Sequence, residues 1–191
     1  YGEIVARLEA SGGIKPRFAV FAGDQVYVDP TAGLYDPRSH DDRYRLPYEA
    51  WLRNRNVRNA LRRIPSFMLL DDHEIDDNWE AIPDDNENKE KKTLGLKAYW
   101  KYQRGMFRRR TFKFDGFDFF MLDTRTERSH RRVGSLASAE LFAPGTMREL
   151  KRWLLRKSGS HFVPKFVVSS AMLLPRHRRA VQRDERLDPS N

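Results

Sequence analysis

The sequence predicts an α/β fold, in which short buried strands alternate with helices along a single domain. Three apolar runs, FAVFA (18–22), PSFMLL (65–70) and KFVVSS (165–170), have the length and composition of buried parallel strands. Segments with helical spacing lie between these runs, and such alternation is typical of layered α/β folds. The sequence contains no internal repeat and no linker-like change in composition, so we expect one domain over 1–191.

The first half of the chain contributes two expected helices around the first two strands. Residues 3–11 have helical spacing and end at a glycine pair, which is a common stop for a helix. Residues 30–46 are rich in Pro, Gly and Asp and predict a loop. Residues 47–64 predict an amphipathic helix with Pro47 near its start. The strand at 65–70 then leads directly into the acidic stretch DDHEIDDNW.

The second half of the chain adds a hairpin and two more helices before the last strand. Residues 80–93 are polar and predict a surface loop, and residues 95–107 predict a helix with several aromatic positions. The segment TFKFDGFDFFML (111–122) predicts a β-hairpin, because two apolar runs flank an Asp-Gly turn at 115–116. Residues 144–158 have the spacing of a helix.

Composition excludes several classes of protein. The apolar residues, 39% of the chain with twelve Phe and four Trp, are enough to bury a core, which excludes a disordered chain. No apolar stretch approaches 18 residues, so we expect no membrane-spanning segment. Cysteine is absent, which excludes disulfides and thiolate metal sites within this sequence.

The chain is strongly basic, with 36 Lys and Arg against 27 Asp and Glu and a formal net charge of +9. Basic residues cluster at 108–110, 128–132 and 176–179. These clusters are either the solvated faces of a basic protein or a surface that attracts polyanionic or phosphate-bearing partners. Charge alone does not choose between the two interpretations.

Polar side chains follow four apolar runs at the points where the expected strands end. They are Asp24, Asp71-Asp72-His73, Asp123-Thr124-Arg125 and Ser169-Ser170. Ligands of open α/β sheets bind beyond the carboxyl ends of the strands. We therefore expect these four groups, which come from distant parts of the chain, to converge on one site.

The acidic stretch after the second strand is the strongest candidate for a metal site. Asp71 and Asp72 follow the strand without a break, so at least one carboxylate faces the protein interior, where an unpaired charge is costly. A divalent or trivalent cation would neutralise it, with the carbonyl oxygen of Asn78 as a further ligand, and His73 at the same edge can either ligate metal or donate a proton. The alternative is an acid-rich helix N-terminus, which does not explain an Asp pair fused to a core strand.

A second candidate group is the GDQVY segment after the first strand. Gly23 allows the chain to turn sharply off the strand and to present Asp24 at the sheet edge. The spacing between Asp24 and Tyr27 brings a carboxylate and a phenol to one point if a turn begins here. A phenolate suits hard, strongly Lewis-acidic ions such as ferric iron. The alternative is that Tyr27 is a half-buried aromatic and Asp24 caps a turn.

The MLDTR segment after the hairpin contributes Asp123 and Arg125. The two side chains either form an ion pair that supports the site, or Arg125 holds an anionic oxygen of the substrate. The sequence leaves both interpretations open.

With GDQVY, DDHEIDDNW and MLDTR in this order, the sequence resembles the PhoD-like alkaline phosphatases of the metallophosphatase superfamily, roughly over 18–175. The resemblance implies a layered αββα sandwich that hydrolyses phosphate mono- and diesters of small molecules, using iron (Fe³⁺) with calcium or another divalent metal. GDxxY is also similar to a motif of purple acid phosphatases. This implies that Asp24 bridges two metals and that Tyr27 binds the ferric ion.

DDHE is similar to the Asn-His-Glu/Asp block of the superfamily. This implies that Asp72 holds the second metal, and that His73 stabilises the transition state or protonates the leaving group. On the chemistry of the residues themselves, Asp71 and Asn78 join the expected metal ligands. Arg125 joins the expected catalytic residues in the same way. The implied mechanism is in-line attack by a metal-bound hydroxide.

Two metal motifs of the family, one upstream of GDxxY and a Gly-Asp-x-His block downstream, lie outside this sequence. We therefore expect 1–191 to be a partial catalytic domain, with an incomplete sandwich. The family implies a periplasmic or extracellular location, and this sequence contains no N-terminal signal.

Two other functions compete with the phosphatase. A basic nucleic-acid-binding module would use the +9 charge, but it leaves the acidic stretch unexplained. Nucleic acid is otherwise expected only as a substrate or through non-specific charge attraction. A non-catalytic domain with a structural metal site accounts for the carboxylates but gives Tyr27 and His73 no role.

Overall fold

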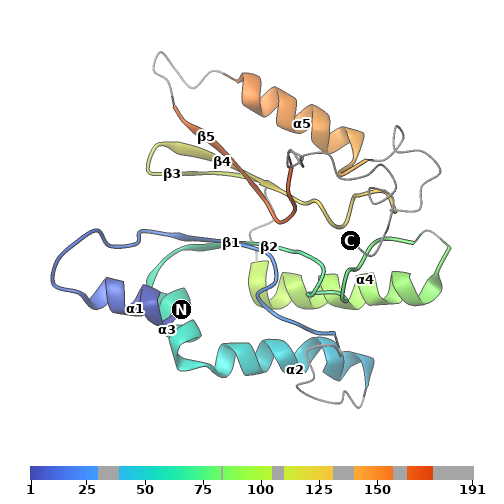
Figure 1. Ribbon diagram of the computed structural model, residues 1–191, viewed down its shortest axis with the longest axis horizontal. Coiled ribbons are helices and arrows are strands. Elements are labelled where there is room, and N and C mark those ends of the chain that lie inside the picture. The colour runs from blue at the N-terminus through green and yellow to red at the C-terminus, as the bar shows by residue number, and fades with distance from the viewer. Residues whose placement is uncertain (30–38, 83, 105–109, 131–139, 157–162, 174–191) are drawn as a thin grey trace, which may run out of the picture.

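The computed structural model describes residues 1–29, 39–82, 84–104, 110–130, 140–156 and 163–173, and in them the chain is a mixed α/β structure (Figure 1). This confirms the predicted α/β class. The helices are α1 (Gly2–Glu9), α2 (His40–Arg53), α3 (Arg55–Arg63), α4 (Asn86–Tyr99), the π-helix η2 (Trp100–Arg104) and α5 (Pro144–Leu155). The strands are β1 (Ala19–Ala22), β2 (Ser66–Leu69), β3 (Thr111–Phe114), β4 (Phe117–Leu122) and β5 (Lys165–Ser169). No helix within these ranges has the length and apolar character needed to cross a membrane.

The strands form two groups with parallel pairs in each. β1 pairs in parallel with β2, with Ala22 opposite Leu69. The other sheet has the order β3-β4-β5, and β4 pairs in parallel with β5, with Leu122 opposite Ser169. The three strands predicted at 18–22, 65–70 and 165–170 are therefore confirmed as parallel strands, and each pair ends at a common edge.

The predicted hairpin is confirmed. β3 and β4 are antiparallel, and Phe114 lies opposite Phe117. Asp115 and Gly116 both have positive φ angles, 52° and 84°. Two positive φ values at the central positions define the type I′ turn, whose twist matches that of the flanking strands.

An aromatic cluster joins the two groups of strands. The rings of Phe67 (β2) and Phe112 (β3) stack at 3.6 Å, and Phe119 (β4) lies 4.7 Å from Phe112. Such pairs contribute about 0.5–1.5 kcal/mol each beyond the burial of their area. On the other side of β4, Phe120 packs against Trp153 of α5 at 5.4 Å. Figure 1 shows α5 on this outer side and α1 to α4 on the opposite side of the β1–β2 pair.

The predictions of a loop over 30–46 and of a single helix over 47–64 are both wrong in part. Residues 40–46 belong to α2 rather than to a loop, and residues 30–38 lie outside the described part. The helix begins there because the Ser39 side chain accepts a hydrogen bond from the backbone N–H of Asp42. The expected helix over 47–64 is divided at Asn54, whose side chain caps α3.

The predicted loop over 80–93 is also wrong from Asn86 onward, where α4 begins. The side chain of Asp85 accepts a hydrogen bond from the Asn88 backbone N–H at 3.0 Å and so caps the helix. The helix predicted over 95–107 continues α4 and passes into η2, and residues 105–107 lie outside the described part. The helix predicted over 144–158 is confirmed as α5, which ends at Leu155.

Gly95 allows α4 to lie directly against the segment after β2. A Cβ atom at Gly95 would lie 2.9 Å from Ile75 Cγ1 and 3.0 Å from the carbonyl oxygen of Glu74. Gly→Ala inside a helix ordinarily stabilises by about 0.5–1 kcal/mol. We expect Gly95→Ala instead to destabilise by about 1–3 kcal/mol, because a backbone carbonyl cannot move aside.

Urea unfolding of the two proteins measures this difference. Gly145→Ala in α5 is the matched control, since its Cβ would have only Arg148 Nη2 nearby, at 3.9 Å. The control should be neutral or slightly stabilising. A Gly95→Ala chain as stable as its Gly145→Ala counterpart would contradict the close approach.

Candidate metal centre

The ends of four strands meet at one place, as the sequence predicted. Gly23 follows β1 with φ +103°, and a Cβ atom there would overlap the Cβ of Asp71, which follows β2. The same Cβ would lie 3.2 Å from the Cβ of Ser170, which follows β5. Thr124, which follows β4, joins the group through a 3.1 Å hydrogen bond between its hydroxyl and that of Ser170. Only glycine fits at position 23, because both the φ value and the space exclude a side chain.

Three carboxylates gather at this meeting point. Asp24, Asp71 and Asp72 each offer an oxygen, and these oxygens lie within 4.8 Å of one another. Asp24 has a left-handed backbone, with φ 58°. Its Oδ1 atom is buried and has no hydrogen-bond partner among the residues that the structure describes. A buried anionic oxygen without a partner is costly, so the donor set fits a bound cation.

The pKa of Asp24 reflects its burial and, after that, the charges of its neighbours. Burial raises the pKa of Asp24 to about 6, and the neighbouring charges of Asp71, Glu74 and Asp72 add to the shift. The positive charge of His73 lowers it by less. Since a cation at this point would favour the ionised form, a bound metal would lower the pKa of Asp24.

Arg125 is the counter-charge of the Asp pair. Its Nε atom donates to Asp71 Oδ1, and its Nη2 atom lies 3.0 Å from Asp72 Oδ1. The sequence left open an ion pair of Arg125 with Asp123, but Asp123 instead closes a turn by accepting from the backbone N–H groups of Arg125 and Thr126, both at 2.9 Å. The guanidinium therefore holds Asp71 and Asp72 side by side.

Glu74 is the buried centre of the hydrogen-bond network. Its side chain is fully buried, and its carboxylate accepts from the backbone N–H groups of Asp24, Gln25 and Asp71 and from the side chain of Gln103. Burial raises the pKa of Glu74, although these hydrogen bonds lower it. The sequence alone does not show whether Glu74 supports the site or faces solvent. Its buried hydrogen bonds show that it supports the site.

His73 is held by a buried carboxylate. Asp29 has a side chain with 0% exposure, and its Oδ2 atom lies 2.6 Å from His73 Nδ1. Burial lowers the pKa of His73, but the hydrogen bond and charge of Asp29 and the charges of Asp72 and Asp24 outweigh it and raise the pKa above its ordinary value. An imidazole so held keeps its Nδ1 proton toward Asp29 and turns Nε2 to the other side.

Tyr27 lies on the face of the same imidazole. The two rings stack at 4.0 Å with an interplanar angle of 27°, and Tyr27 is 42% exposed. Burial raises the pKa of the Tyr27 phenol, and the charges of Asp24 and Asp29 raise it further. These carboxylates oppose a phenolate, so the ferric ligand expected from the sequence requires the charge of the metal itself.

A second possible group of ligands adjoins the first. Asp72, His73 and Asp77 each offer an atom within 4.8 Å of the others. Asn78, another predicted ligand, has φ 50°, and its backbone N–H donates to Asp72 Oδ2 at 2.8 Å. Its side-chain amide donates to Asp77 Oδ1 at 3.1 Å. All seven predicted site residues therefore belong to one contiguous region.

The remaining acids of this region are paired with cations of the protein. Asp76 accepts from Arg43 of α2 and from Lys91 of α4, and Glu80 pairs with Arg128. The protein's own basic residues thus neutralise much of the acidic stretch. Within the described residues, the centre leaves one buried carboxylate oxygen, Oδ1 of Asp24, without a hydrogen bond.

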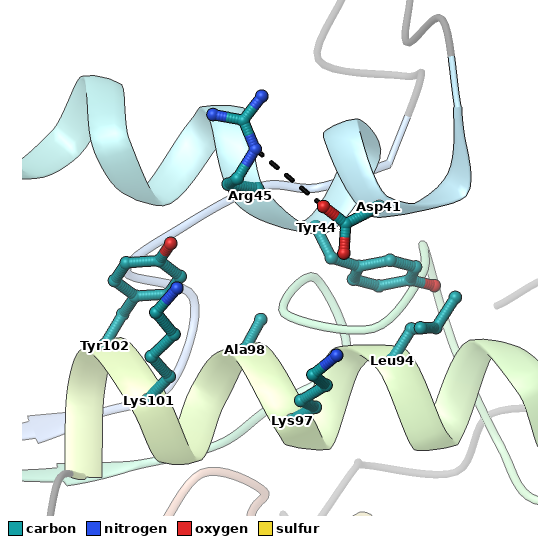
Figure 2. A pocket seen from close by; sticks show the side chains of 8 residues that line it. All are labelled: Asp41, Tyr44, Arg45, Leu94, Lys97, Ala98, Lys101 and Tyr102. Atoms are coloured by element: carbon teal, nitrogen blue, oxygen red, sulfur yellow. Dashed lines mark ion pairs between the residues drawn. The ribbon is translucent and has the colours of Figure 1, made fainter.

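A separate hollow of about 90 Å³ lies between α2 and α4 (Figure 2). Basic side chains line it, but Arg45 is within ion-pair distance of Asp41, Asp42 and Glu49. Figure 2 shows the Arg45–Asp41 pair on the α2 side, and Lys101, which lies 4.7 Å from the Tyr102 ring centre, on the α4 side. The charge of Arg45 is therefore compensated by acidic neighbours, and the hollow is a weaker candidate than the strand ends.

Sequence reasoning missed Asp29 and Gln103 and left Asp77 without an assigned role. Asp29 ends the same GDQVYVD segment as Asp24, so proximity in sequence was an available signal. Gln103 carries no such signal, because η2 brings it to Glu74 from a distant helix.

Fold and site define an α/β protein with a carboxylate-rich centre, suited to a metal ion, at the carboxyl ends of its strands. The model of the PhoD-like phosphatase family matches residues 1–161, so the chain belongs to this family. The solved structure of PhoD is similar over 86% of this chain, with a TM-score of 0.61 and 18% sequence identity, which supports the fold. The chain spans 38% of the length of that PhoD chain. No curated protein matches this sequence.

Proposed function

We propose that the chain carries part of the centre of a metal-dependent phosphoester hydrolase. The family is one of phosphatases, which suggests phosphoester hydrolysis. The observation that carries the metal assignment is the buried, unpartnered Oδ1 of Asp24 within 4.8 Å of oxygens of Asp71 and Asp72. Tyr27 and Asn78 complete the proposed ligand set at the edge of this cluster.

The proposed metals are iron and calcium, or another divalent ion in place of calcium. Carboxylate, phenolate and amide oxygens are hard donors, which suit such ions. When bound, the metals would supply Lewis-acid stabilisation of phosphoryl oxygens and activation of the attacking water. Arg125 pairs with both Asp71 and Asp72, and its positive charge reduces the repulsion that an anionic substrate meets at this acidic surface.

His73 is the proposed catalytic group for the leaving side of the substrate. Asp29 fixes Nδ1, so Nε2 is oriented to donate a hydrogen bond or a proton to a phosphoryl or leaving-group oxygen. Tyr27 stacks on the ring and limits its rotation. The raised pKa of His73 favours the protonated form that such a donor needs.

The layered arrangement of the family is part of this proposal. The order α5, the β3–β5 sheet, the β1–β2 pair and α1 to α4 supports assigning these elements to part of an αββα sandwich (Figure 1). In this proposal 1–191 is one partial catalytic domain, and a periplasmic or extracellular location accompanies it. Small-molecule phosphoesters are the proposed substrates.

A nucleic-acid-binding module is not favoured as the alternative. In the described parts of the basic clusters, Arg110 pairs with Glu127 and Arg128 pairs with the buried Glu80. These guanidinium groups serve internal ion pairs. A purely structural metal site would leave the Asp29–His73 pair without a role.

Metal content and chelation test the proposal. The purified chain should contain bound iron and calcium by mass spectrometric metal analysis, with a tyrosinate-to-iron absorption band. A protein that combines this chain with the family's two further metal motifs should also hydrolyse p-nitrophenyl phosphate or its bis ester. Chelation should remove metal, colour and hydrolysis together, and metal addition should restore them. A chain that binds no metal would contradict the proposal, as would hydrolysis that survives complete removal of metal.

A further inference from the structure

We propose that Glu74 is a positioning residue that sets the spacing of the metal ligands Asp24 and Asp71 without contacting the metal, and that Gln103 of η2 fixes its carboxylate. This inference rests on the proposed function, because it concerns the ligands of the same centre. That Glu74 joins the loops after β1 and β2 follows from the hydrogen bonds alone and does not depend on the proposed function.

The carboxylate of Glu74 connects the loops that follow β1 and β2. Its Oε2 atom accepts from the backbone N–H of Asp24 at 3.2 Å and from that of Asp71 at 3.0 Å. Its Oε1 atom accepts from the Gln25 N–H at 2.8 Å and from Gln103 Nε2 at 3.2 Å. One side chain thus fixes the backbone of two ligands from different strands.

A carboxylate matches the hydrogen-bond donors around this position. Four N–H groups point at two oxygens, and a carboxylate accepts about four hydrogen bonds while donating none. An amide in its place would turn an NH₂ group toward N–H donors. Glu74 is fully buried, so water cannot substitute for a lost contact.

The surroundings leave little room for either loop to adjust. Gly23 already lies against Asp71, and Asp24 already has a left-handed backbone. On the far side, Gly95 of α4 packs against the Glu74 carbonyl. A displaced Glu74 would therefore move Asp24 relative to Asp71, whereas metal–ligand distances tolerate only about 0.2 Å.

The π-helix explains how Gln103 reaches this centre. η2 follows α4 directly, and single π turns inside α-helices occur frequently at functional sites. Gln103 is buried, and its amide donates to the same Oε1 that holds the Gln25 N–H. The irregular turn thus supplies the fourth donor to Glu74.

Calcium titration of the metal-free chain tests the proposal. We expect Glu74→Gln to weaken Ca²⁺ binding by about 10–100-fold, the range typical of residues that orient metal ligands. Glu74→Asp keeps the charge but shortens the reach, so it should weaken binding to a similar degree. Gln103→Met removes one of the four hydrogen bonds at similar volume and should have a smaller effect in the same direction.

Amide hydrogen exchange by NMR gives a readout that does not need metal. The amides of Asp24, Gln25 and Asp71 should exchange faster in Glu74→Gln than in the wild type. Glu80→Gln is the matched control, because Glu80 is also buried but pairs with Arg128. It should leave the exchange of these three amides and Ca²⁺ affinity unchanged.

The outcomes separate this inference from the proposed function. A wild-type chain that binds no Ca²⁺ argues against the metal centre, and amide exchange then decides the role of Glu74. Wild-type binding with unchanged affinity in Glu74→Gln overturns the inference alone. A Glu74→Asp chain with full affinity would show that charge, rather than position, is what Glu74 contributes.

Discussion

Replacing Asp24 with Asn is expected to weaken metal binding by at least about 100-fold, more than the loss of a residue that only orients ligands. In the metal-free chain the same change should raise stability above pH 6. The two effects have one cause, because Asp24 carries the buried oxygen without a hydrogen bond in a cluster of like charges.

The pH dependence of the second effect follows from the raised pKa. Asp24 titrates near pH 6 in the folded chain, against 3.8 for the unfolded reference. The folded state therefore binds more protons between these values, and stability contributed by the protonated group is lost as the pH rises through about 6. The asparagine side chain of the variant is neutral throughout, so the variant should lack this loss. Below pH 4 the two chains should differ little from this cause.

Urea unfolding of chelated protein between pH 4 and 8, with calcium titration at pH 7.5, measures both effects. Asp115→Asn is the matched control, since Asp115 also has a left-handed backbone but lies in the hairpin turn and pairs with Arg17 on the surface. Its free energy of unfolding should fall by no more than about 1 kcal/mol, and its calcium affinity should equal that of the wild type. If Asp24→Asn leaves the calcium affinity intact, Asp24 is not a metal ligand.

In the proposed hydrolase, replacing Asp29 with Asn is expected to lower kcat for phosphoester hydrolysis by about 100–10,000-fold, the range for the loss of general acid catalysis. Asp29 is buried and binds His73 Nδ1 at 2.6 Å, so its carboxylate both orients the ring and stabilises the imidazolium. An amide can turn its NH₂ toward Nδ1 and favour the opposite tautomer. KM should change little, because the Asp29 side chain is fully buried.

The pKa of His73 provides a measurement independent of turnover. Since the charge and hydrogen bond of Asp29 raise this pKa, Asp29→Asn should lower it, which NMR titration of the imidazole detects. Asp118→Asn is the control, because Asp118 is also buried but lies on β4 near Lys113 and Arg156. It should reduce stability and retain kcat. If both variants lose kcat equally, Asp29 contributes only to packing and stability and does not orient His73.

The sequence predicted features that depend on local pattern. The type I′ hairpin follows from an Asp-Gly pair between apolar runs, and the convergence of strand ends follows from parallel pairing. The starts of α2 and α4 were missed because each helix begins in a polar stretch. The start of each helix is set by one capping residue, Ser39 for α2 and Asp85 for α4.

The partners within the site were less predictable because they are distant in sequence. Arg125 pairs with Asp71 and Asp72 rather than with the nearby Asp123, whose side chain is occupied by backbone N–H groups of its own turn. Gln103 reaches Glu74 only because of the π turn after α4. Such contacts depend on tertiary packing, which neither periodicity nor residue type encodes.

The internal neutralisation of the acidic stretch bears on the order of folding and metal loading. Arg43, Lys91, Arg125 and Arg128 supply positive charge to this stretch from helices and loops before and after it in the chain. Small zinc domains need their metal as a template for folding. Here the counter-ions are built into the polypeptide, so we expect the chain to fold without metal and to bind the proposed metal only afterwards.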